Sequence, residues 1–138
     1  MPLITKKYKF CAAHKYWNSK WDENKNFSIF QEDVRLHGHN YELDITIGGP
    51  IDQESGFIIN IIDLNKIMEE FVINNLDHSQ IEKDIDWFHD KQPSTENLVV
   101  YIWKQIADKI PLPAYLYLIK LQETPTIYTE YYGPGGVK

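Results

Sequence analysis

Two runs of alternating apolar and polar residues are the clearest pattern in the chain. They cover residues about 3–14 and about 37–48. Alternation with a period of two is typical of a strand that has one buried face. In the second run, Tyr41, Leu43, Ile45 and Ile47 share one face with His37 and His39. We therefore predict two strands whose core-facing sides also carry histidines.

Residues 16–34, between these runs, are polar and rich in aromatic side chains. The segment is too long for a tight hairpin, so we expect a candidate functional loop. After the second run, Gly48-Gly49-Pro50 and residues 52–56 supply turns.

Apolar residues at intervals of three and four predict two helices after these turns. The first begins at an Asp63 cap and runs to about Asn75, and the second follows residues 93–97 and stops at Pro111-Leu112-Pro113. Their apolar stripes consist of Leu64, Ile67, Met68, Phe71 and Val72 in the first and Val99, Ile102, Trp103, Ile106 and Ile110 in the second.

Two final strands are expected at about 115–123 and 126–132, separated by Thr124-Pro125. The order ββααββ predicts an α+β fold, with a four-stranded antiparallel sheet and two helices on one face. The whole chain, residues 1–138, is expected to form a single domain.

Charge and composition exclude several classes of partner. The chain has 14 Lys and Arg against 20 Asp and Glu, and Arg35 is its only arginine. No basic stripe can follow a nucleic-acid backbone, and no apolar run is long enough to span a membrane. The single cysteine, Cys11, cannot form an internal disulfide, and the first residues lack the features of a secretory signal. We expect a cytoplasmic protein that binds neither nucleic acid nor membrane.

Three histidines form a candidate metal site. His37 and His39 are two residues apart in one predicted strand, and His14 ends the other. If the strands pair in an antiparallel arrangement, the three imidazoles converge. Three nitrogen ligands with an open fourth position are typical of catalytic zinc. The alternative is that these are ordinary polar residues near strand ends, but the His-x-His pair with an upstream strand histidine favours the metal.

Five segments in register resemble the family of 6-pyruvoyltetrahydropterin synthase and 6-carboxytetrahydropterin synthase. They are residues 10–14 (FCAAH), 37–41 (HGHNY), 76–78 (LDH), 93–97 (PSTEN) and 122–124 (QET). The resemblance implies the tunnelling fold, in which subunits form trimeric barrels that stack as hexamers, with active sites between subunits. It also implies Zn2+ and the substrate 7,8-dihydroneopterin triphosphate.

The resemblance also assigns roles to individual residues. His14, His37 and His39 match the zinc ligands, and Asp77 with His78 matches a proton relay that one subunit can place beside the zinc of another. The alternative for Asp77 and His78 is that they cap the exit of the first helix.

Glu123 matches the pterin anchor, because a carboxylate can accept two hydrogen bonds from a pterin ring. Without the resemblance it would be interpreted as a strand-end residue facing water. Thr95 and Glu96 match residues that line the pterin pocket, although Ser94 or Thr95 is also a good helix cap.

The chain departs from the family at the catalytic thiol. Relatives have a cysteine shortly before the His-Gly-His element, whereas residues 31–36 contain none. Asp33 and Glu32 are the nearest acid-base groups. Cys11 has the strand parity opposite to His14, and we expect it to pack as a small apolar residue.

The leading interpretation is a zinc-dependent lyase of tetrahydropterin biosynthesis, with a 6-pyruvoyl or 6-carboxy product, the latter a queuosine precursor. Arg35, Lys15 and Lys20 are candidates to bind the triphosphate, or are solvated surface charges. A family branch with an acidic residue near the missing cysteine cleaves the side chain to 6-hydroxymethyl-7,8-dihydropterin, a folate precursor, and this is one alternative. The others are a non-catalytic pterin-binding zinc protein and a zinc hydrolase with an unrelated substrate.

Overall fold

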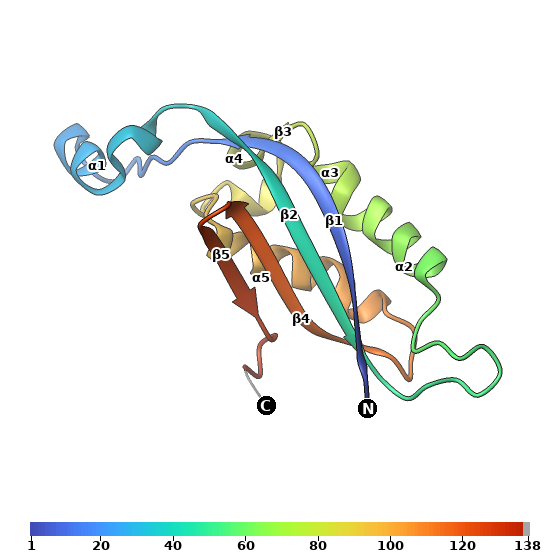
Figure 1. Ribbon diagram of the computed structural model, residues 1–138. Coiled ribbons are helices and arrows are strands. Elements are labelled where there is room, and N and C mark those ends of the chain that lie inside the picture. Colours follow the sequence, from blue (N-terminus) through green and yellow to red (C-terminus); the bar gives the residue numbers. More distant parts are fainter. Residues whose placement is uncertain (137–138) are drawn as a thin grey trace.

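A computed structural model of the protein describes residues 1–136. Strands β1 (Leu3–His14) and β2 (His37–Gly48) pair in an antiparallel arrangement along their whole length, from Leu3 opposite Gly48 to His14 opposite His37. Both predicted strands are confirmed, and their pairing brings all three histidines to one end of the sheet (Figure 1).

The sheet has the order β3-β1-β2-β4-β5. Strands β4 (Tyr115–Thr124) and β5 (Ile127–Tyr131) extend it in antiparallel fashion on the β2 side. On the other side β3 (Ser79–Gln80) pairs in parallel with residues 12–13 of β1. The predicted four strands are correct, but the sheet has five, because a two-residue strand is too short to show any periodicity.

The predicted helices cover one face of the sheet (Figure 1). The first comprises α2 (Ile61–Met68), a π-helical turn η2 (Glu69–Ile73) and α3 (Asn74–Leu76), and the second is α5 (Thr95–Ile106) followed by η4 (Ala107–Lys109). The expected Asp63 cap is wrong: Asn60 caps α2 by accepting the Ile62 N–H at 2.9 Å, and Asp63 lies within the first turn.

Two short helical segments, α4 (Ile81–Asp84) and η3 (Asp86–Phe88), connect β3 to α5. The core lies between the helices and the sheet. Its fully buried side chains include Leu43, Ile45, Ile47, Leu64, Met68, Leu98 and Ile102.

Residues 15–36 form an arm that projects from the end of the sheet that carries the histidines (Figure 1). The expected loop instead contains α1 (Glu23–Phe30) and the 3-10 turn η1 (Gln31–Val34). Asn26 is the only buried side chain of α1, and its amide donates to the carbonyls of Asn18 and Asp22 at 3.0 Å. The helix has no apolar stripe on a core, which is why periodicity did not reveal it.

Among residues 1–136, no helix has the length and apolar character needed to cross a membrane.

Candidate active site

The three histidines converge as their strand pairing predicts. His14 is fully buried at the end of β1, and its ring centroid lies 4.6 Å from that of His37 and 5.0 Å from that of His39. One ring nitrogen from each histidine lies within 4.8 Å of the other two. We call this group the histidine cluster.

Backbone carbonyls fix the orientation of two of the three rings. His14 Nδ1 lies 2.8 Å from the Pro93 carbonyl, and His37 Nδ1 lies 2.7 Å from the Arg35 carbonyl. A carbonyl only accepts, so each Nδ1 carries the proton and each Nε2 presents a lone pair. This arrangement is typical of metal-binding histidines.

Unsatisfied ring nitrogens are a second reason to expect a metal ion at the cluster. His14 Nε2 and His39 Nε2 are buried and have no hydrogen-bond partner. A buried acceptor without a partner costs free energy, which a coordinated cation would offset. His14, His37 and His39 are therefore the residues that could hold zinc.

Burial favours the neutral form of two of the three histidines. It lowers the pKa of His14 to about 4, an effect that the nearby His37 and His39 reinforce. Burial also lowers the pKa of His39. Neutral imidazole is the form that binds a metal, so the site is prepared for one at neutral pH.

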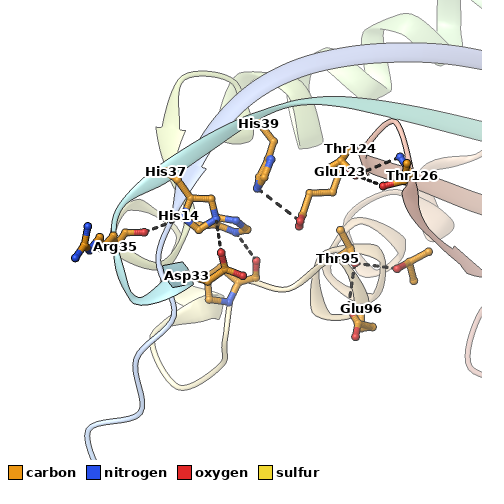
Figure 2. A network of polar contacts seen from close by, with 12 residues as sticks. His14, Asp33, Arg35, His37, His39, Thr95, Glu96, Glu123, Thr124 and Thr126 are labelled. Atoms are coloured by element: carbon orange, nitrogen blue, oxygen red, sulfur yellow. Dashed lines mark hydrogen bonds and ion pairs between the residues drawn. The ribbon is translucent and has the colours of Figure 1, made fainter. Parts of the chain in front are cut away.

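Two carboxylates border the cluster on different sides (Figure 2). Asp33 Oδ1, from η1, lies 3.7 Å from His37 Nε2, and Glu123 Oε1, from β4, lies 3.5 Å from His39 Nε2. The Glu123 side chain is 15% exposed, so it does not face water as a simple strand end would. Burial raises its pKa, with a further contribution from the Asp33 charge.

The start of α5 lies near Glu123. Thr95 Oγ1 donates to Glu96 Oε1 at 2.9 Å and lies 2.8 Å from Thr129 Oγ1 of β5. The charge of Glu96 contributes to the raised pKa of Glu123. Ser94, not Thr95, is the helix cap, since its hydroxyl accepts the Asn97 N–H at 3.2 Å. The side chains of Thr95 and Glu96 therefore do not cap α5 and can contact other groups near Glu123.

Asp77 and His78 lie at the outer edge of β1, just before β3. Asp77 Oδ1 accepts the Cys11 N–H at 2.9 Å, while Asp77 Oδ2 lies 2.9 Å from His78 Nδ1. His78 also lines a cavity of about 370 Å³ beside Cys11 and Asn40, which belong to the helix-free face. The carboxylate binds the backbone of β1, while the backbone of Asp77 is the C-cap of α3 and donates its N–H to the Ile73 carbonyl at 2.8 Å. Within one chain this pair does not face the histidine cluster.

Cys11 lies on the face opposite His14, as its strand parity predicts. Its expected packing as a small apolar residue is wrong, because the residue is exposed and Sγ donates to Asn40 Oδ1 at 2.7 Å. No helix covers that face of the sheet (Figure 1). The thiol therefore has no direct route to the histidine cluster of its own chain.

The structure separates the other predicted site residues. Glu32 and Arg35 pair with each other at 3.8 Å, with side chains 87% and 78% exposed, and Arg35 points away from the cluster in Figure 2. Lys15, Lys20 and Lys91 border a cavity of about 400 Å³. This cavity places three cations together close to the end of β1.

Tyr16 is a site residue that the sequence interpretation did not include. Its ring is tilted against His14, with centroids 5.1 Å apart, and stacks on Phe30 at 5.4 Å. Burial raises its pKa, and the charges of Glu123 and Asp33 contribute. A signal was available, because Tyr16 continues the parity of Phe10 and His14 beyond the end of the strand.

Comparison with known proteins identifies relatives of this chain. The sequence model of 6-pyruvoyl tetrahydropterin synthase matches residues 3–134. The chain is 35% identical over 134 residues to the 6-pyruvoyl tetrahydrobiopterin synthase of Drosophila melanogaster, covering 96% of this chain and 80% of the fly protein.

Solved structures agree with this match. The 6-pyruvoyl tetrahydropterin synthase of Caenorhabditis elegans superposes with a TM-score of 0.86 at 28% identity, covering 96% of this chain and 97% of the worm chain. The Plasmodium vivax enzyme, solved as a mutant with cysteine in place of a catalytic glutamate, has a TM-score of 0.60 at 20% identity, covering 94% and 97% of the two chains. The cluster of three histidines, the sheet that forms it and these matches together show that the chain belongs to the 6-pyruvoyl tetrahydropterin synthase family.

Proposed function

We propose that this lyase converts 7,8-dihydroneopterin triphosphate to 6-pyruvoyl tetrahydropterin in a zinc-dependent reaction. The observation that carries the proposal is the convergence of three imidazoles beside the half-buried carboxylate of Glu123. The names of the relatives favour the 6-pyruvoyl product. The reaction eliminates triphosphate and moves hydrogen from the side chain of the substrate to its ring.

His14, His37 and His39 would hold the zinc ion. Bound there, zinc would supply Lewis-acid catalysis by polarising the hydroxyl groups of the substrate side chain. The hydrogen bonds from Nδ1 to the Pro93 and Arg35 carbonyls hold the His14 and His37 rings in place.

Glu123 would orient the pterin. A carboxylate can accept hydrogen bonds from the 2-amino group and from ring N3–H in a planar, bidentate match. Thr95 and Glu96 lie close enough to line the same pocket from the start of α5. Glu123 would thereby direct the substrate side chain toward the histidine cluster.

Asp33 would act as the acid-base group where relatives have a thiol. Its carboxylate is 3.7 Å from His37, whereas Glu32 pairs with Arg35 at the surface. A carboxylate is a weaker base than a thiolate, so it depends on acidification of the substrate hydroxyls. The catalytic glutamate of the Plasmodium vivax relative supports a carboxylate in this role.

Asp77 and His78 would act as the proton relay of a neighbouring subunit. A carboxylate that orients an imidazole is a common acid-base arrangement, and the His78 side chain is 81% exposed. Among residues 1–136, β3 covers only residues 12–13 of the outer edge of β1, and β5 has no neighbour on its outer side. Open strand edges readily pair with another chain, which supports a homo-oligomer of joined sheets, such as a hexamer of two trimers.

The triphosphate would bind cationic side chains near the end of β1. Lys15, Lys20 and Lys91 border one cavity, together with Glu82 and with Asp90, which pairs with Lys91. Arg35 instead pairs with Glu32 at the surface, so the lysines are the better candidates as a group. With its exposed free cysteine, the protein suits a reducing cytoplasm.

The second candidate is cleavage of the same substrate to 6-hydroxymethyl-7,8-dihydropterin. The observation that favours it is the carboxylate of Asp33 in place of a thiol. Incubation of zinc-loaded protein with 7,8-dihydroneopterin triphosphate, followed by mass spectrometry, separates the two. A 6-pyruvoyl product with release of triphosphate supports the first proposal, a 6-hydroxymethyl product supports the second, and unchanged substrate contradicts both.

A further inference from the structure

We infer that Asp33 is the fourth ligand of the metal in the resting protein and gives up that position when the substrate binds. The inference rests on the metal site proposed above. It assigns Asp33 a task before catalysis, in addition to its proposed role as the acid-base group.

The distances around His37 suit two ligands of one ion. Tetrahedral zinc holds nitrogen and oxygen ligands at about 2.0–2.2 Å, so neighbouring ligand atoms lie about 3.4 Å apart. Asp33 Oδ1 and His37 Nε2 are 3.7 Å apart. Asp33 thus already has the separation from His37 that two ligands of one ion need, and rotation of its exposed side chain would have to bring it toward His14 and His39 as well.

The backbone places these two side chains with respect to each other. The Tyr16 N–H donates to the Asp33 carbonyl at 2.9 Å, which ties η1 to the chain just beyond His14. Two residues later, the Arg35 carbonyl accepts from His37 Nδ1. The same short turn thus carries the carboxylate and orients the ring beside it.

Glu32 provides a natural contrast within this turn. It is adjacent to Asp33 in the sequence, but its carboxylate pairs with Arg35 and is 87% exposed. Only one of the two acidic residues faces the histidine cluster. Glu32→Gln is therefore a matched control that removes the same charge from the same turn.

Asp33 also has the exposure that a displaceable ligand needs. Its side chain is 61% exposed, so the released carboxylate can return to water without a large desolvation cost. Glu123 is the competing candidate, at 3.5 Å from His39 Nε2, but its side chain is only 15% exposed, although it lies near the end of β4. A ligand that must leave and return is better supplied by Asp33.

Cobalt substitution tests the assignment. Co2+ replaces zinc in the purified protein, and its visible absorption reports coordination geometry, while competition with a chelator gives the zinc affinity. We expect Asp33→Asn to weaken zinc binding by at least about 10–100-fold, because loss of even an outer-shell partner of a metal ligand costs that much. Glu32→Gln should leave both the spectrum and the affinity unchanged.

The substrate analogue 7,8-dihydroneopterin, which has the hydroxyl groups but no triphosphate, tests the displacement. It should change the cobalt spectrum of the wild-type protein and change that of Asp33→Asn much less. A spectrum and zinc affinity of Asp33→Asn equal to those of the wild type would overturn the inference. So would a loss that appears in Glu123→Gln and not in Asp33→Asn. Failure of the wild-type protein to bind either metal would instead remove the proposed metal site itself.

Discussion

Asp77 Oδ1 accepts the Cys11 N–H at 2.9 Å, at the outer edge of β1. This contact determines where the proposed proton relay can act. His78 follows Asp77, and its backbone N–H donates to the Cys11 carbonyl, so the pair is attached to β1 at two points. The relay is therefore held at the edge of β1, where a neighbouring subunit could approach it.

Mixing two impaired variants tests whether the active site is shared between subunits. At a substrate concentration well below KM, pure His78→Ala should be slower than the wild type by about two to four orders of magnitude, and pure Glu123→Gln by about 10-fold or more because its KM is raised. If the sites are composite, random reassembly of the two variants pairs an intact His78 with an intact Glu123 in about a quarter of the sites. Recovery of that share of wild-type activity is the expected result. No recovery after verified subunit exchange would place both residues in one subunit's site.

Zinc content provides the test of the histidine cluster. The purified protein should hold about one zinc per chain, and His37→Ala combined with His39→Ala should remove most of it, because a three-nitrogen site loses two ligands. Elemental analysis measures the content, and circular dichroism checks the fold. His89→Ala is the control, since that histidine lies outside the cluster and pairs with Asp86. Full zinc occupancy in the double variant would contradict the assignment.

Glu123→Gln should chiefly weaken substrate binding. The amide has the size of the carboxylate but presents an N–H₂ donor to the donors of a pterin and lacks the charge. We expect KM to rise by about 10-fold or more, consistent with about 1.5–3 kcal/mol for a hydrogen bond to a charged group. Steady-state kinetics and equilibrium binding of 7,8-dihydroneopterin measure the effect. An unchanged KM with a reduced kcat would assign Glu123 to the chemistry instead.

Cys11→Ala should retain activity close to that of the wild type. Its contact with Asp77 uses the backbone N–H, which alanine keeps, and its thiol binds only Asn40. Asp33→Asn, by comparison, should lose most activity. Parallel assays of the two variants show whether the Asp33 carboxylate or the Cys11 thiol is the acid-base group. A loss of more than about 10-fold in Cys11→Ala would show that the thiol takes part in acid-base chemistry.

Asp77 should make stability depend on pH in a defined direction. The hydrogen bond from the Cys11 N–H, and to a lesser extent His78, lowers the pKa of Asp77 in the folded protein. A lowered folded pKa stabilises the protein above the unfolded value, near 3.9, and this stabilisation is lost as pH falls through the folded value. The Tm of Asp77→Asn should therefore lie below that of the wild type at pH 7, and the difference should shrink toward pH 3. A difference that stays constant with pH would contradict the charge effect.

The helices and strands that could be predicted from the sequence are those in which apolar residues repeat regularly over many residues. β1, β2 and the two helices each bury one face, and that face is visible as a repeat of apolar residues. Helix α1 has no such face, since Asn26 is its only buried residue, and β3 is two residues long. Neither leaves a periodic signal.

The same reasoning applies to the candidate site. The convergence of His37 and His39 with His14 follows from strand parity and antiparallel pairing alone. The position of Asp77 and His78 at the edge of β1 depends on how the chain leaves α3 and runs beside β1, and no local pattern records that path. Which of Asp33 and Glu32 faces the histidine cluster depends on the direction of each side chain in a 3-10 turn. The sequence of two adjacent acidic residues does not reveal that direction.

The construction of the projecting arm has a consequence for how the protein opens. Its helix is held to residues 18–22 by the amide of Asn26, whereas β1, β2 and the long helices share the buried core. Segments with few buried apolar contacts unfold locally at a smaller free energy than the core does. We therefore expect the arm to open as a unit of its own, with Asp33 at its boundary with the sheet. Access to the histidine cluster would then depend on a local opening equilibrium, which can change while the global stability of the fold stays the same.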